Sequence, residues 1–129
     1  MATTFLSLLD HAQAILNGTV RLPQAIATRA AAFLARQALE DTTRALCHRA
    51  GANIDRATMR SQLIVVRAFH GDQVTNTANI AWLGLSNACH HHAYELTPTV
   101  DEVRHWFDLV ANLSAPARLI STANKVRST

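Results

Sequence analysis

Glycine, proline, cysteine and aromatic residues are all scarce in this chain of 129 residues. It holds four Gly, three Pro and two Cys, and aromatic residues make up 5% of it. Sandwiches and barrels need many tight turns, so the scarcity of Gly and Pro argues against them and favours helices. Cys47 and Cys89 form no closely spaced pair. This argues against a disulfide scaffold and predicts a reducing, cytoplasmic setting.

Charge and long apolar runs are scarce as well. Charged residues make up 16% of the chain and hydrophobic residues 49%, which is enough for a packed core and too apolar for a disordered protein. The net charge is only +3, but eleven of the twelve basic residues are Arg, which suits phosphate or carboxylate contacts. No stretch approaches a membrane span, and no basic segment opens the chain as in a signal peptide. We therefore expect no membrane association.

Apolar residues recur at steps of three and four residues in five segments. These predict helices over about 3–17, 22–50, 56–69 and 73–93, and a last helix that starts at a Thr99–Glu102 capping box. In the fourth segment the apolar stripe is regular and continues to His92; its members are Val74, Ala78, Ala81, Leu85 and Ala88. The sequence thus predicts a single all-α domain, an up-and-down bundle of about five helices over residues 1–113, followed by a loosely ordered tail over 114–129.

A cluster of metal-ligating residue types, Cys89-His90-His91-His92, ends the fourth segment. Neighbouring helical residues point about 100° apart, so only Cys89 and His92 share a face. Three interpretations stay open. The cluster is a polar helix end; or a metal site completed by Cys47, His48, His70 or another chain; or the setting of a functional histidine, His92, within reach of Asn87 or Tyr94.

Arginines form a strip on the third predicted helix. Arg56, Arg60 and Arg67 fall within about 40° of one another on a helical wheel, on a segment that is otherwise apolar nearly all round. The strip is either a solvent edge that pairs with Glu40, Asp41 or Glu95, or a face that contacts phosphates. Arg36, Glu40 and Arg44 step by four on the second helix and predict an exposed ladder with a structural role.

Two stretches resemble the HEPN superfamily of small all-helical proteins. Residues 31–40, AAFLARQALE, continue to Ala45-Leu46 and are similar to the second-helix pattern of that family. Residues 87–94, NACHHHAY, run into Thr97-Pro98-Thr99 and resemble the end of its fourth helix and the following connection. With the order of the helices, the resemblance covers about residues 5–113. The resemblance implies a HEPN-like bundle, a homodimer, and a defence, toxin–antitoxin or regulatory setting.

Many HEPN proteins are ribonucleases that need no metal, with four to six residues between an Arg and a His. By resemblance, Asn87 matches the polar residue after that Arg, His92 the histidine and Tyr94 an aromatic position, but Ser86 stands where the Arg belongs. No histidine of this chain has an Arg at the required distance. Without that cation the charge of a phosphate transition state lacks its partner, which puts nuclease activity in doubt.

The sequence therefore favours a non-catalytic HEPN-like module that contacts RNA, a nucleotide or a cognate protein. Arg56, Arg60 and Arg67 are its candidate contact residues, and we expect no cofactor because Gly-rich phosphate loops and the common hydrolase motifs are missing. One alternative is an active ribonuclease that uses His92, with Asn87 and Tyr94 nearby and an Arg from outside the motif. The other is a metal-binding protein that uses Cys89 and His92.

Overall fold

The structure, a computed structural model, describes residues 2–52, 54, 56–90 and 98–127, with side chains for 7–52, 54, 56–90 and 98–115. This part of the chain forms five helices and no strand: α1 (Ala2–Leu16), α2 (Gln24–Arg49), α3 (Met59–His70), α4 (Asp72–Cys89) and α5 (Val100–Arg127). The predicted all-α bundle is thereby confirmed. None of the helices described has both the length and the apolar character to cross a membrane.

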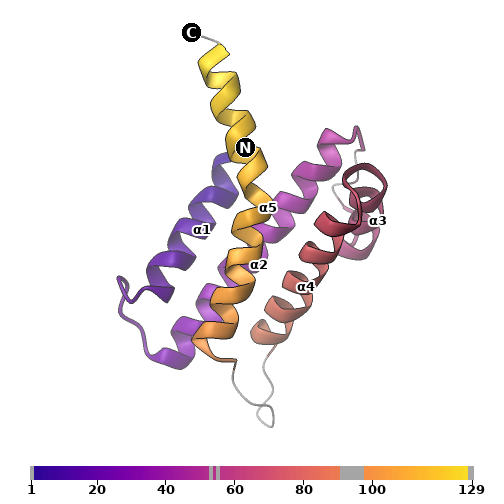
Figure 1. The fold of residues 1–129 in the computed structure, drawn as a ribbon. Coiled ribbons are helices and arrows are strands. Elements are labelled where there is room, and N and C mark those ends of the chain that lie inside the picture. Colours follow the sequence, from indigo (N-terminus) through magenta and orange to yellow (C-terminus); the bar gives the residue numbers. More distant parts are fainter. Residues whose placement is uncertain (1, 53, 55, 91–97, 128–129) are drawn as a thin grey trace.

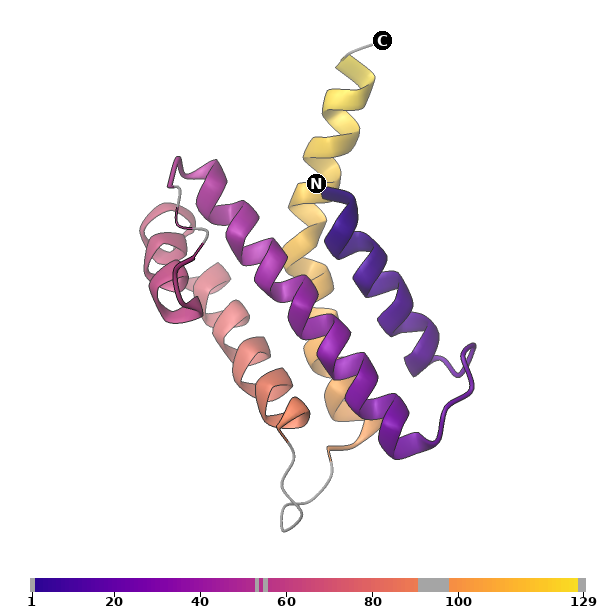
Figure 2. The same cartoon turned by 180° about the vertical axis from the view of Figure 1, so that it is seen from behind.

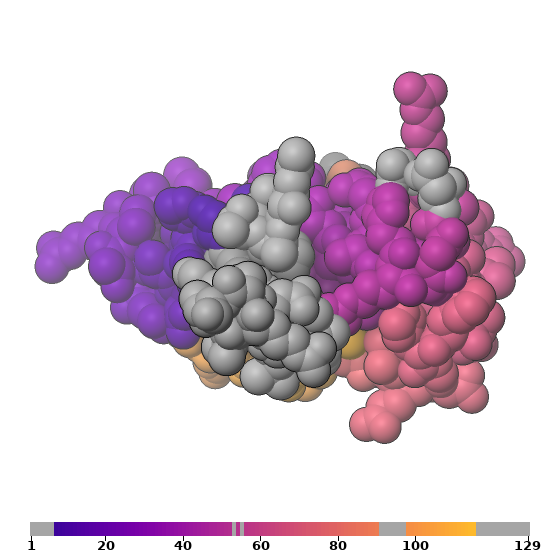
Figure 3. All heavy atoms as spheres, turned by 90° about the horizontal axis from the view of Figure 1, so that it is seen from above, coloured from indigo at the N-terminus to yellow at the C-terminus, as the bar shows by residue number. Residues whose placement is uncertain are grey.

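Four long helices run alternately up and down, and the short α3 lies across one end of them (Figure 1). Seen from behind, α2 passes along the bundle between α1 and α4 (Figure 2). Helix α2 contacts all four other helices, whereas α1 contacts only α2 and α5. Consequently α3 and α4 form one side of the molecule and α1 the other (Figure 3).

Small side chains line the inner face of the bundle and let the helices approach closely. Four alanines of α2 and three of α4 are buried, and larger side chains from α1, α4 and α5 fill the space between them. The predicted stripe on α4 is confirmed at Ala78, Ala81, Leu85 and Ala88, all of which are buried. On α5 the buried face consists of Val103, Phe107, Val110 and Leu113.

The N-terminal ends of α3 and α5 show how the sequence starts each helix. At α5 the predicted capping box is confirmed: Thr99 Oγ1 accepts from the Glu102 amide at 3.1 Å, and a Glu102 carboxylate oxygen accepts from the Thr99 amide at 3.2 Å. The sequence predicts a third helix from about residue 56, with Asp55 as its candidate cap by residue type, but Asp55 lies outside the described residues. Helix α3 begins instead at Met59, because Thr58 Oγ1 accepts from the Ser61 amide at 3.2 Å.

Helix α4 ends earlier than its apolar stripe predicts. The sequence predicted a helix to about residue 93, but α4 ends at Cys89 and His90 has non-helical angles, with φ −102° and ψ 40°. The last carbonyls of a helix need partners from outside it. Arg29 of α2 supplies one, since its Nε donates to the Cys89 carbonyl at 3.4 Å.

Helix α5 is longer than predicted. The sequence predicted a helical end near Leu113, but the helix continues through Pro116 to Arg127 and projects beyond α1 (Figure 1). Within a helix, proline removes the hydrogen bond of its own missing amide and crowds the preceding turn. The alanines on both sides of Pro116 favour helix strongly. Pro116 and the polar residues after it predict the end of a helix, whereas the alanines beside Pro116 favour its continuation, and the helix continues.

Candidate functional site

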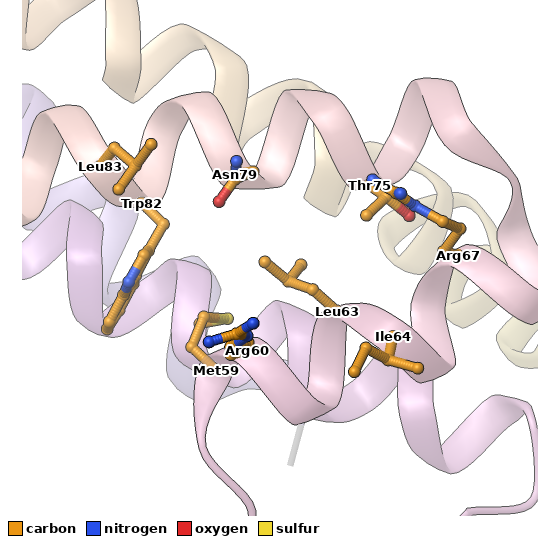
Figure 4. Close-up of a pocket in the computed structure, with 9 residues that line it drawn as sticks. All are labelled: Met59, Arg60, Leu63, Ile64, Arg67, Thr75, Asn79, Trp82 and Leu83. Carbon is orange, nitrogen blue, oxygen red and sulfur yellow. The ribbon is translucent and has the colours of Figure 1, made fainter.

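A groove of about 580 Å³ lies between α3 and α4 on the side of the molecule away from α1. Helices α3 and α4 cross here (Figure 4). Most of its lining is apolar, with one arginine beside Met59 and another beside Thr75 (Figure 4). The lining residues are Met59, Arg60, Leu63, Ile64, Arg67, Thr75, Asn79, Trp82 and Leu83.

The groove exists because α3 and α4 are apolar on more than one face. Leu63 is buried and holds α3 against the main core. Its neighbour Ile64 points about 100° further round and is 66% exposed. On α4, Ala81 is buried in the core while Leu83 is 61% exposed. Large apolar side chains therefore line the groove and still face solvent, which marks a surface for contact with another molecule.

Of the three arginines predicted to form a strip, the structure brings two to the groove. Arg60 and Arg67 lie on α3, seven residues apart, and both line it. Arg56 lies in the exposed turn before α3, because that helix starts only at Met59. The expectation that all three share one helical face is wrong for Arg56.

The two arginines of the groove differ in their partners. Arg67 Nε lies 3.5 Å from a carboxylate oxygen of Asp72, and a terminal guanidinium nitrogen of Arg67 donates to Asn76 Oδ1 at 3.4 Å. Arg60 is exposed and forms no hydrogen bond or ion pair with the residues that the structure describes. The positive charge of Arg60 is thus open to a ligand, whereas that of Arg67 is already opposed.

A second group of polar residues lies where α4 ends beside α2. The Arg36 guanidinium stacks on the Trp82 ring, 4.5 Å from its centre, and one of its terminal nitrogens lies 3.2 Å from Nε2 of His90. Arg36 Nε is 3.8 Å from Glu40. We call Arg36, Trp82, Cys89 and His90 the α4-end cluster. The Arg36–Glu40 step of the predicted ladder is present, but Arg36 is half-buried and Arg44 pairs with Asp41 instead.

This cluster is partly buried and combines the charges of Arg36 and Arg29 with the carboxylate of Glu40. Burial raises the pKa of the Cys89 thiol, while Arg36 and Arg29 act in the opposite direction by favouring the thiolate. Arg36 Nε and Ser86 Oγ are buried without hydrogen-bond partners. An Arg beside a His ring is an arrangement that suits an anion such as a phosphate.

The predicted catalytic residues are only partly visible in the structure. His92 and Tyr94 lie outside the described residues, and Asn87 is exposed near the end of α4. Sequence reasoning missed Arg36 as a neighbour of the histidine cluster. Arg36 lies 54 residues before His90, and its regular spacing from Glu40 looked like that of a surface ladder.

The predicted metal alternative gains no further ligand from the part of the chain that the structure describes. Among the residues described, no three His, Cys, Asp or Glu side chains are grouped as metal ligands would be. Cys47 donates to the Gln62 carbonyl, and His70 hydrogen-bonds with the Leu46 carbonyl. These residues lie where α2 meets α3, at the opposite end of α4 from Cys89 (Figure 1). His92 lies outside the described residues.

Comparison with protein families, curated proteins and solved structures finds no match to this chain. The resemblance to the HEPN superfamily therefore stays a prediction based on the residues quoted above. What the chain does must be argued from the groove and the α4-end cluster.

Proposed function

We propose that this chain is a binding module whose α3–α4 groove holds an acidic amphipathic helix of a partner protein. The observation that carries the proposal is the exposure of Ile64 and Leu83 beside a groove that also presents Arg60. Amphipathic helices bind in such grooves by inserting apolar side chains spaced three, four and seven residues apart. A volume of about 580 Å³ accommodates several such side chains.

A protein segment suits the groove better than RNA or a second copy of the chain. RNA presents charged phosphates and planar bases, which would make few apolar contacts with the aliphatic side chains of Ile64 and Leu83. Two copies related by a twofold axis through the groove would bring the arginines of both copies together, and like charges oppose association. An acidic helix satisfies both the apolar lining and the positive charge.

The sequence favoured a non-catalytic module that contacts RNA, a nucleotide or a cognate protein. This proposal selects the protein among these partners. A HEPN-like origin, a defence, toxin–antitoxin or regulatory setting, a cytoplasmic location and a homodimer remain predictions beside it. RNA or nucleotide contact is an alternative outcome of the same experiment.

The test is a selection from a displayed library of helical peptides on the immobilised protein. Apolar residues are fixed at helical spacing and the other positions are randomised. Peptides recovered on wild type should bind Ile64→Glu at least about tenfold more weakly, because the substitution places a carboxylate in the apolar lining. The matched control is Ile80→Glu. Ile80, on α4, is apolar and exposed like Ile64, but it does not line the groove.

The outcomes separate the candidate partners. Recovered peptides that lose affinity for Ile64→Glu but not for Ile80→Glu support the groove. Failure to recover any such peptide refutes the proposal. A labelled RNA oligonucleotide is titrated in parallel. If RNA binds, if Arg60→Gln and Arg67→Gln weaken it, and if Ile64→Glu does not, the RNA-contacting alternative replaces the protein partner.

A second candidate, a ribonuclease site at the end of α4, is supported by the 3.2 Å contact between Arg36 and His90. The predicted ribonuclease needed an Arg from outside the motif close to the histidines, and Arg36 has that property. In such a site the guanidinium stabilises charge on the phosphate, and a histidine moves the proton. His92 remains the predicted acid or base.

Cleavage of a fluorogenic RNA oligonucleotide tests this second candidate. We expect His92→Ala and Arg36→Met each to lower the rate by about 100-fold or more, while Arg44→Met, on the same helix, leaves it unchanged. A wild type that cleaves nothing rules the candidate out. So does a His92→Ala protein that cleaves at the wild-type rate.

A further inference from the structure

The two arginines of the groove are unequal. Arg67 lies beside Thr75 (Figure 4). Its guanidinium lies 3.5 Å from Asp72 and 3.4 Å from Asn76. Arg60, at the Met59 end, has no such partner among the residues described. A ligand carboxylate near Arg67 would meet the Asp72 carboxylate as well. The same group near Arg60 would meet an unopposed cation.

The difference between Arg60 and Arg67 affects binding once a ligand covers the groove. An apolar ligand that fills the space beside Leu63 and Ile64 removes water from around Arg60, and a cation that loses water without gaining a partner costs free energy. A carboxylate at that position offsets the cost and gains a charge-assisted hydrogen bond. At Arg67, the contacts with Asp72 and Asn76 already offset the cost of losing water.

Resting on the proposed function, we infer that the bound helix carries one Asp or Glu at the edge of its apolar stripe, paired with Arg60, and needs none opposite Arg67. Arg60 and Arg67 are seven residues apart on α3, which corresponds to about 10 Å along the helix axis. An amphipathic helix of purely apolar contacts fits such a groove in either direction. A single charge pair at one end fixes which direction it takes.

The experiment repeats the peptide selection on wild type, Arg60→Gln and Arg67→Gln. On wild type, Asp or Glu should be enriched at one position relative to the fixed apolar residues. Arg60→Gln should remove that enrichment and weaken the best wild-type peptide by about fivefold, the upper range for a partly exposed ion pair. Arg67→Gln should keep the enrichment and change affinity by less than about twofold.

A peptide in which the enriched residue is changed to Gln completes the cycle. It should lose affinity for wild type and bind Arg60→Gln as well as the parent peptide does, because the two substitutions remove one interaction. If recovered peptides depend on Ile64 but show no acidic preference, or if Arg67→Gln has the larger effect, this inference is wrong. The groove then stands as a site for an amphipathic helix, without a carboxylate paired with Arg60. If no peptide depends on Ile64, the groove proposal itself fails.

Discussion

Gly84 keeps α4, which carries one wall of the groove, in close contact with α5. A Cβ added at Gly84 would lie 2.2 Å from Cε2 of Trp106 and 2.5 Å from both Cδ2 and Nε1. These atoms belong to the middle of the indole, and Trp106 is half-buried and packs against the main core. The ring therefore cannot swing aside as the tip of a flexible side chain would. Gly84→Ala is expected to destabilise the protein.

Two opposing contributions determine the size of the effect. In the middle of a helix, Ala is favoured over Gly by about 0.5–1 kcal/mol because Gly loses more conformational freedom on folding. Forcing an extra methyl group into a packed site costs about 1–3 kcal/mol. At distances of 2.2–2.5 Å the clash falls toward the upper part of that range. The expected net loss in the free energy of unfolding is thus about 1–2 kcal/mol.

Urea unfolding followed by circular dichroism measures this loss, with Asn87→Ala as the control. Asn87 is exposed on the same helix, so its substitution should be neutral or slightly stabilising. In a Trp106→Leu background the clash is relieved, and Gly84→Ala should become stabilising by about 0.5 kcal/mol. If Gly84→Ala stabilises the wild type, or if its sign is the same in both backgrounds, the close packing of Gly84 on Trp106 is refuted.

Three further predictions concern the α3 cap, the thiols and the oligomeric state. Thr58→Ala should lower the free energy of unfolding by about 1 kcal/mol in urea titrations, while Thr58→Ser, which keeps the capping oxygen, should change it little; equal losses would contradict the cap. Burial raises the pKa of Cys47 and Cys89, so iodoacetamide should alkylate both more slowly in the native than in the unfolded protein. Equal alkylation rates would argue against buried thiols. The raised pKa values also stabilise the fold below the ordinary thiol pKa, and the free energy of unfolding should fall as the pH rises through the higher native pKa values. Sedimentation at micromolar concentration should show a dimer, and a monomer alone would remove that prediction.

The helices were predictable from the sequence because burial follows a simple period. The stripe from Ala78 to Ala88 is regular, and each of its predicted members there is buried. Helix boundaries were less predictable because they depend on single interactions. Asp55 and Thr58 are both acceptable caps by residue type, and only the structure shows Thr58 Oγ1 accepting the Ser61 amide. The end of α4 involves Arg29, which is distant in sequence.

The site was predictable only where it depended on one helix. The helical wheel placed Arg60 and Arg67 on a common side, and both line the groove. It could not show that Leu83 of α4 would face the same space, because that requires the crossing of two helices. Nor could it show that Asp72, the first residue of the next helix, would pair with Arg67, whereas Arg60 has no partner among the described residues.

Trp82 connects the two candidate sites and determines how their tests must be interpreted. One part of its ring lines the groove, and the Arg36 guanidinium stacks on it at 4.5 Å. Arg36→Met therefore removes a neighbour of His90 and also the group that holds the indole in place. A loss of RNA cleavage in Arg36→Met supports the ribonuclease candidate only if the variant still binds the selected peptides as wild type does. If peptide binding falls together with cleavage, a displaced Trp82 accounts for both, and the His92→Ala result alone decides the second candidate.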